Sequence, residues 1–73
     1  MAKVPINAGS DANSIRELQK ALVANGYSTP TNGIFDGATI ASLEAFQDGN
    51  ALLVQASCDA ACWQALQAKL AAS

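Results

Sequence analysis

Hydrophobic residues recur at helical spacing in three stretches of the chain, which are separated by segments rich in glycine, proline and small polar residues. The first stripe consists of Ile15, Leu18 and Leu22. Because these positions are three and four residues apart, they share one face of a helix. Four residues can cap its start: Ser10, Asp11, Asn13 and Ser14. Gly26 suits the position after the last turn, so we predict a helix over about residues 12–25.

A second helix is predicted to begin after Asp36, because its carboxylate can accept hydrogen bonds from the first free backbone amides. The apolar stripe of this helix consists of Ile40, Leu43 and Phe46. We expect the helix to end at Asp48, with Gly49 as the stop. A third helix is capped by Ser57 or Asp59. Its apolar stripe consists of Trp63, Leu66 and Leu70.

The segments on either side of the first helix lack a helical pattern. Residues 1–9 are predicted to form an extended lead-in, because Pro5 has no backbone donor and biases its neighbour toward extended conformations. Residues 26–36 are predicted to form a structured loop with four residues typical of turns: Gly26, Pro30, Asn32 and Gly33. The loop ends in Ile34 and Phe35, which we expect to anchor it on the helices.

A second structured loop is predicted over residues 49–57. It carries three large apolar residues: Leu52, Leu53 and Val54. We expect these side chains to tuck under the helices, or the segment to form a short extended pair with the lead-in. Together the elements predict one all-α domain over residues 10–71, a small three-helix bundle with two structured loops.

The composition predicts a thin core. Of the 73 residues 51% are hydrophobic, but 16 of them are alanines. A chain of this size has few large side chains to bury and lies close to the limit of independent stability. The three stripes and the loop anchors use nearly all of the larger apolar residues. We therefore expect recognition on the surface rather than in a buried pocket, and we predict no cofactor.

The charge pattern argues against nucleic acid as a partner. The net charge is −2, and the four cations are scattered along the chain: Lys3, Arg16, Lys20 and Lys69. Binding to a phosphate backbone requires clustered cations. No apolar stretch reaches the length of about 18 residues that indicates a membrane span, and the first residues lack the apolar region of a signal peptide. We expect synthesis in the cytoplasm without a signal peptide, and no membrane insertion.

Two cysteines, Cys58 and Cys62, stand four positions apart, and the chain has no histidine. Two thiols cannot complete a tetrahedral zinc site within one chain, and a cysteine nucleophile activated by histidine is excluded as well. Two alternatives remain, free thiols that pack as small apolar side chains or a short disulfide. A disulfide is feasible if Cys58 lies just before the third helix, and it would stabilise the fold by about 2 kcal/mol.

Hydrolysis of a glycan requires two carboxylates that flank the scissile bond. The candidates each lie at a predicted helix cap or on a predicted exposed face: Glu17, Asp36, Glu44, Asp48 and Asp59. The sequence places no pair of them in a cleft that would raise one pKa, as general acid catalysis requires. We therefore predict that the chain is not an enzyme.

Several short motifs follow one another along the three predicted helices. The first helix contributes Ile15-x-x-Leu18-Gln19-x-x-Leu22, followed by Gly26-Tyr27. The second carries Gly33-x-Phe35-Asp36-x-x-Thr39-x-x-x-Leu43-x-x-Phe46-Gln47, and the third Trp63-x-x-Leu66. In this order and spacing they resemble the helical peptidoglycan-binding domain, a three-helix module of bacterial and phage cell-wall hydrolases. The resemblance extends over about residues 10–70, nearly the whole chain.

The chain departs from the family pattern just before the third helix. There the family usually carries Asp-Gly, an aliphatic residue and Gly-Pro before Thr-Trp. In this chain Cys58 replaces the aliphatic residue and Cys62 the threonine. A disulfide between them could substitute for the turn that the missing glycines and proline would fix. Asp36 also stands where the family often has glycine. Because the sequence ends at Ser73 without a catalytic domain, we expect either a separately produced module or one domain of a longer enzyme.

The resemblance implies a non-catalytic module that binds peptidoglycan, in particular its stem peptide, and targets a muralytic enzyme such as a phage endolysin. Such a module would act at the cell wall or in the periplasm, as a monomer that can be tethered to a catalytic domain. A shallow groove would be formed by the first two helices and the loop between them. The ligand-binding candidates are Gln19, Tyr27, Asn32, Asp36, Thr39 and Gln47. For Gln19 and Gln47 the alternative is a structural hydrogen bond to the loops.

A second hypothesis is a small helical module for protein interaction or assembly, for example on a phage or secretion particle. Only 14% of the residues are charged, and residues 51–54 form an apolar segment in a predicted loop. Both features are compatible with a protein interface.

Overall fold

The computed structural model contains three helices of 13 residues each: α1 (Ala12–Ala24), α2 (Gly37–Gly49) and α3 (Ala60–Ala72). It describes residues 4–72, with side chains described up to residue 69. The predicted stripe residue Leu70 therefore lies outside the described side chains. Within the described range the only β pairing is one isolated antiparallel bridge, between Ile6 and Cys58. The prediction of an all-α, three-helix domain is confirmed.

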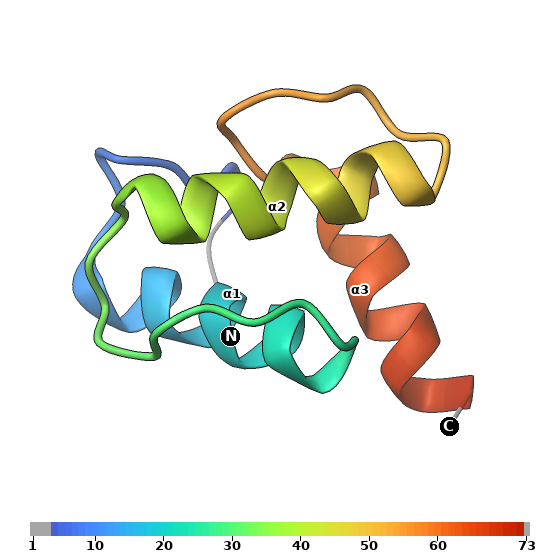
Figure 1. The fold of residues 1–73 in the computed structure, drawn as a ribbon, viewed down its shortest axis with the longest axis horizontal. Helices are drawn as coiled ribbons and strands as arrows, with labels where there is room; N and C mark the ends of the chain where they lie inside the picture. The colour runs from blue at the N-terminus through green and yellow to red at the C-terminus, as the bar shows by residue number, and fades with distance from the viewer. Residues whose placement is uncertain (1–3, 73) are drawn as a thin grey trace.

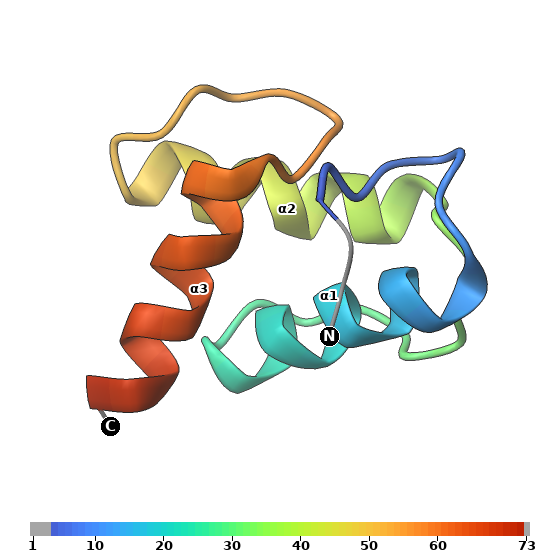
Figure 2. The ribbon, with the colours of Figure 1, turned by 180° about the vertical axis from the view of Figure 1, so that it is seen from behind.

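The helices are arranged around α1, which packs against both α2 and α3. α1 and α2 run in the same direction, so the first loop, residues 25–36, returns along α1 to the start of α2 (Figure 1). The second loop, residues 50–59, returns along α2 before α3 begins, as the view from behind also shows (Figure 2). Each long connection thus runs back alongside the helix that precedes it.

The core lies where the three helices and the lead-in meet. Its buried side chains are Ile6, Ile15, Leu18, Ala21, Leu22, Leu43, Phe46, Cys58, Cys62 and Leu66. Tyr27, Phe35, Leu52, Trp63 and Ala65 are partly buried against it. The three predicted stripes therefore supply most of the core, as expected. Ile6, which the sequence pattern did not assign to the core, is fully buried because its backbone pairs with Cys58 in both directions.

The three helices begin in the same way, with an aspartate that accepts a hydrogen bond from a backbone amide three residues ahead. Asp11 accepts from Ser14 N at 3.1 Å, Asp36 from Thr39 N at 3.2 Å and Asp59 from Cys62 N at 2.9 Å. Each bond satisfies an amide that the helix itself leaves free. The prediction for Asp36 is confirmed, and the open alternatives for the other two helices resolve to aspartate.

The ends of α1 and α2 share a second motif, in which the backbone closes back onto the last turn. After α1, Tyr27 N donates to Leu22 O at 2.8 Å and Gly26 has a φ of +92°. After α2, Leu52 N donates to Gln47 O at 2.9 Å, and the residue with positive φ is Ala51, at +58°. This backbone closure places the left-handed residue one position after the cap.

The predicted stop at Gly49 is therefore wrong. Gly49 is the last residue of α2, and the helix closes over Ala51 instead. The cap between them is Asn50, whose side-chain Nδ2 donates to Phe46 O at 2.8 Å. The side-chain bond and the backbone closure hold the turn, so an alanine adopts a conformation that glycine usually occupies.

Three apolar loop residues lie in solvent, contrary to the prediction that they anchor the loops. Ile34 is 59% exposed, Leu53 72% and Val54 48%. Of the three apolar residues of the second loop only Leu52 packs on the core. The lead-in pairs with Cys58 rather than with residues 52–54, so Ile6 enters the core and the outer part of the second loop stays outside.

Candidate functional site

The side-chain amide of Gln19 fastens the first loop to the helices from inside. Gln19 lies on α1 and is fully buried. Its Nε2 donates to Ile34 O and Thr39 Oγ1, both at 2.9 Å, and lies 3.3 Å from Asn32 Oδ1. Its Oε1 accepts from Gly33 N at 2.9 Å. Backbone groups in this part of the loop have no partners from a helix or sheet, and the Gln19 side chain supplies them instead.

Thr39, in the first turn of α2, extends this network to the other part of the loop. Its hydroxyl is fully buried and lies 3.0 Å from Thr29 Oγ1 in addition to the bond from Gln19. Further along, the Ser42 hydroxyl donates to Ser28 O. The first loop is thus bonded to α2 at its beginning and to α1 at its end, which leaves it little freedom to move.

Gly33 is the point of closest approach between the loop and α1. Its φ is +78°, and a Cβ built on it would lie 3.0 Å from Ala12 O and 3.2 Å from Ala12 Cβ. A larger residue would meet both a strained backbone conformation and a steric clash. The sequence motif contained this glycine, but only the structure shows that it is a buried contact as well as a turn.

The outer face of the first loop presents three exposed side chains close together in sequence: Asn32, Ile34 and Asp36. Asn32 Oδ1 accepts from Ile34 N at 3.0 Å, which fixes a tight turn at the tip of the loop. Asp36 uses Oδ1 to cap α2, where it accepts from Thr39 N. Asn32 Nδ2 and Asp36 Oδ2 make no hydrogen bond within the described residues, so an amide donor and a carboxylate acceptor flank an exposed isoleucine.

Tyr27 lies at the opposite end of this loop and is partly buried. The backbone closure after α1 places its ring edge-on against Phe46, with the centroids 5.6 Å apart and the planes at 88°. A Cβ on Gly49 would lie 3.2 Å from the Tyr27 hydroxyl oxygen, so this glycine leaves room for the hydroxyl beside the end of α2. Tyr27 thus packs on the core and stays partly exposed.

Gln47, on α2, holds the second loop as Gln19 holds the first. It is fully buried, its Nε2 donates to Ser57 O at 2.9 Å, and its Oε1 accepts from Gln55 N at 2.9 Å. Its Nε2 also lies 4.0 Å from Cys62 Sγ. No buried side-chain nitrogen or oxygen within the described residues lacks a partner.

Both cysteines are buried free thiols, and Cys58 Sγ donates to Cys62 Sγ at 2.8 Å. This bond to Cys62 raises the pKa of the Cys58 thiol, and burial raises it further. The same bond lowers the pKa of Cys62 by more than burial raises it, and the contact with Gln47 adds a smaller lowering effect. The two sulfurs therefore differ in acidity although they are neighbours.

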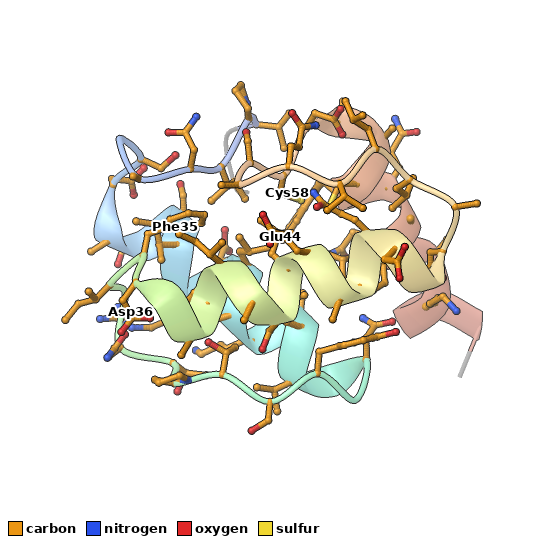
Figure 3. The ribbon with its side chains drawn as sticks, turned by 45° about the horizontal axis from the view of Figure 1, so that its top comes forward. Phe35, Asp36, Glu44 and Cys58 are labelled. Atoms are coloured by element: carbon orange, nitrogen blue, oxygen red, sulfur yellow. The ribbon has the colours of Figure 1, made fainter. Side chains whose placement is uncertain are left out.

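The carboxylates of α2 do not converge. Asp36 lies at the start of α2, whereas Phe35 and Glu44 lie on the side of α2 that faces the second loop and Cys58 (Figure 3). The described residues contain no cluster of three or more side chains that could hold a metal ion. No helix within residues 4–72 is both long enough and apolar enough to cross a bilayer.

Residues 11–66 match the model of one protein family, which is described as "Putative peptidoglycan binding domain". The matched range covers well over half of the chain and includes α1, α2, both loops and the first part of α3. The chain therefore belongs to this family of peptidoglycan-binding domains. The search of curated proteins and the search of solved structures found no match.

The structure divides the six ligand-binding candidates into two groups. Gln19, Thr39 and Gln47 are fully buried with their polar atoms bonded, which is the structural alternative considered for the two glutamines. Tyr27, Asn32 and Asp36 reach the surface. The sequence pattern did not identify Ile34 as a surface residue, because an apolar residue between a turn and the start of a helix is typical of an anchor. The sequence signal that could have placed Ile34 at the surface is Asn32, two positions earlier, because asparagine is typical of exposed turns.

Proposed function

We propose that this chain is a non-catalytic module that binds the stem peptide of peptidoglycan through the outer face of the first loop. Peptidoglycan binding follows from the family. The choice of surface is supported by one observation: the first loop is fixed from inside by Gln19, yet presents Ile34 to solvent at 59% exposure. A rigid loop loses little conformational freedom when it binds, so an exposed apolar side chain on it contributes efficiently to affinity.

The exposed groups suit a short peptide. Asn32 Nδ2 can donate to a peptide carbonyl, Asp36 Oδ2 can accept from an amide or an ammonium group, and Ile34 can contact small aliphatic side chains between them. Thr39 N is already bonded to Asp36, so this amide at the start of α2 is not open to a ligand carboxylate. In the proposal Gln19, Thr39 and Gln47 position the loops and do not touch the ligand.

The proposal includes a role in targeting. Contacts from one loop give modest affinity, whereas a tethered catalytic domain gains from a high local concentration on a repetitive polymer. We propose that the module holds a muralytic enzyme, such as a phage endolysin, on the cell wall. In a zymogram with embedded cell walls the isolated chain should give no cleared band.

The binding surface is tested by co-sedimentation with purified sacculi. Ile34→Ser should weaken binding about 5-fold, as expected for the loss of a central contact worth about 1 kcal/mol. Val54→Ser is the matched control, because Val54 is also exposed but lies on the second loop. Equal binding by wild type and Ile34→Ser would exclude the first loop as the binding surface.

The stem peptide is tested with glycan strands that an amidase has freed of their peptides and that are immobilised on beads, because strands without peptide cross-links no longer sediment. The proposal predicts that binding is lost while the glycan strands remain. Undiminished binding to the stripped glycan would show that the module recognises the sugar instead.

A second candidate function, protein interaction, is favoured by the adjacent exposed residues Leu53 and Val54. It makes the opposite prediction for the two serine variants. A partner protein held by the second loop would be released by Val54→Ser and retained by Ile34→Ser. The two functions are therefore separated by one pair of variants.

A further inference from the structure

The two cysteines meet where the lead-in, the second loop and α3 come together. Cys58 lies two positions before the first residue of α3, and Cys62 is the third residue of that helix. Their side chains are 0% and 1% exposed, and their sulfurs are in contact at 2.8 Å. Figure 3 shows Cys58 near the end of the second loop, above α2. This placement meets the condition for a disulfide at such short spacing, with one cysteine outside the helix.

Cys58 also joins the lead-in to the rest of the domain. Ile6 N donates to Cys58 O at 2.9 Å, and Cys58 N donates to Ile6 O at 2.8 Å. A covalent bond from Cys58 to Cys62 would therefore fix the start of α3 and, through these two hydrogen bonds, the buried Ile6. The disulfide would strengthen the end of the second loop, whose backbone receives only two hydrogen bonds from Gln47.

We propose that Cys58 and Cys62 form a structural disulfide when the chain folds in an oxidising compartment. The oxidant is a disulfide, either of a small molecule such as oxidised glutathione or in the active site of a thiol oxidoreductase. The Cys62 thiolate attacks one sulfur of this disulfide and releases the first thiol. The Cys58 thiolate then attacks Cys62 Sγ, the mixed disulfide breaks, and the second thiol leaves. The two protons of the cysteines end on the two released thiols, and the oxidant is reduced by two electrons.

The burial of both sulfurs decides when this reaction occurs. A sulfur with almost no exposure cannot be reached by an external disulfide. The thiol–disulfide exchange therefore takes place before the first turn of α3 packs on the core. For the same reason a finished bond is shielded from reductants. A chain that folds in a reducing compartment should keep two unreactive thiols, and one that folds in an oxidising compartment should carry the bond.

The bond is tested by refolding the full chain from denaturant in a mixture of oxidised and reduced glutathione, and in parallel with a strong dithiol reductant. Each sample is freed of small thiols in acid, then denatured at mildly alkaline pH, where free cysteines react as thiolates, alkylated with iodoacetamide and weighed by mass spectrometry. The proposal predicts no alkylation after oxidative refolding and two alkyl groups after reductive refolding. Two alkyl groups, or persistent glutathione adducts, in the oxidative sample would overturn it.

The structural role is tested by thermal unfolding of the two samples. Closing so short a loop should raise Tm by about 10 °C. The double variant Cys58→Ala/Cys62→Ala should show no difference between the two conditions. If that variant fails to fold, hydrogen exchange on the wild type decides: the Ile6 amide should exchange more slowly in the oxidised sample. Equal Tm values and equal exchange at Ile6 would contradict a structural disulfide. None of these measurements involves peptidoglycan, so they stand apart from the proposed function.

Discussion

Each of the two long loops of this domain is held by a buried glutamine, but the other contacts that hold them differ. Each is held by a buried glutamine that directly follows a fully buried hydrophobic residue, Gln19 after Leu18 and Gln47 after Phe46. In each case both ends of the side-chain amide bond to the loop. In each pair the apolar residue fills the core, and the glutamine beside it provides hydrogen-bond partners for backbone groups of the loop.

The difference lies in what surrounds the glutamine. The first loop adds a buried threonine, Thr39, and a close glycine contact at Gly33, so polar bonds and steric fit hold it. The second loop has fewer bonds of this kind and relies on the pair Cys58–Cys62 and the bridge to Ile6. We therefore assign the proposed binding role to the more firmly held first loop, and a structural role to the second, which a covalent bond can strengthen.

The largest effect should come from the glutamines. Gln19→Leu keeps the volume but leaves the buried Gly33 amide without a partner, so the free energy of unfolding should fall by about 3 kcal/mol. Gln47→Leu should cost less, about 2 kcal/mol, because the Gln55 amide that it frees lies in a partly exposed segment. Urea unfolding followed by circular dichroism measures both. A larger loss for Gln47→Leu would reverse the proposed ranking of the two loops.

The next effect compares two glycines of the first loop. Gly33→Ala should destabilise the domain by about 2 kcal/mol, because it combines a strained φ with the clash against Ala12. Gly26→Ala should cost about 1 kcal/mol, because it meets the same strain in open space. The difference in unfolding free energy between the two variants isolates the steric contact. If both variants lose the same amount, the loop is not tightly packed on α1.

The smallest effect is a gain at the start of the second loop. Ala51→Gly should stabilise the domain by about 1 kcal/mol, because it relieves an alanine held at positive φ. Ala45→Gly is the matched control on the exposed face of α2, and there the same substitution should cost about 1 kcal/mol. Thermal unfolding of both variants checks the sign. A lower Tm for Ala51→Gly would show that the closure after α2 is not under strain.

Local patterns predicted the parts of this fold that depend on neighbouring residues. Helical spacing identified the stripes, and short-range capping chemistry identified Asp36 and Gly26. The resemblance that rests on Leu-Gln and Phe-Gln singled out Gln19 and Gln47. Sequence alone left open whether these amides face a ligand or a loop, since that depends on where a segment many positions away comes to lie.

The parts that could not be predicted depend on contacts between distant segments. Ile6 is buried only because Cys58, far along the chain, pairs with its backbone. Leu53 and Val54 are large apolar residues, which usually pack on the core, but the path of the second loop leaves them in solvent. For the helix end, Gly49 was the better local candidate. The bonds of Asn50 and Leu52 nevertheless placed the left-handed residue at Ala51.

The proposal that the first loop binds the stem peptide is tested most directly by NMR spectroscopy, in a titration of isotope-labelled chain with soluble muropeptides of defined stem peptide. We expect the changes in backbone amide chemical shift to concentrate in residues 27–36, with Ile34 among the largest, while the signals of residues 50–59 stay unchanged. The corresponding disaccharide without a peptide should cause no change. Chemical-shift changes centred on the second loop, or equal changes with the bare disaccharide, would contradict the proposal.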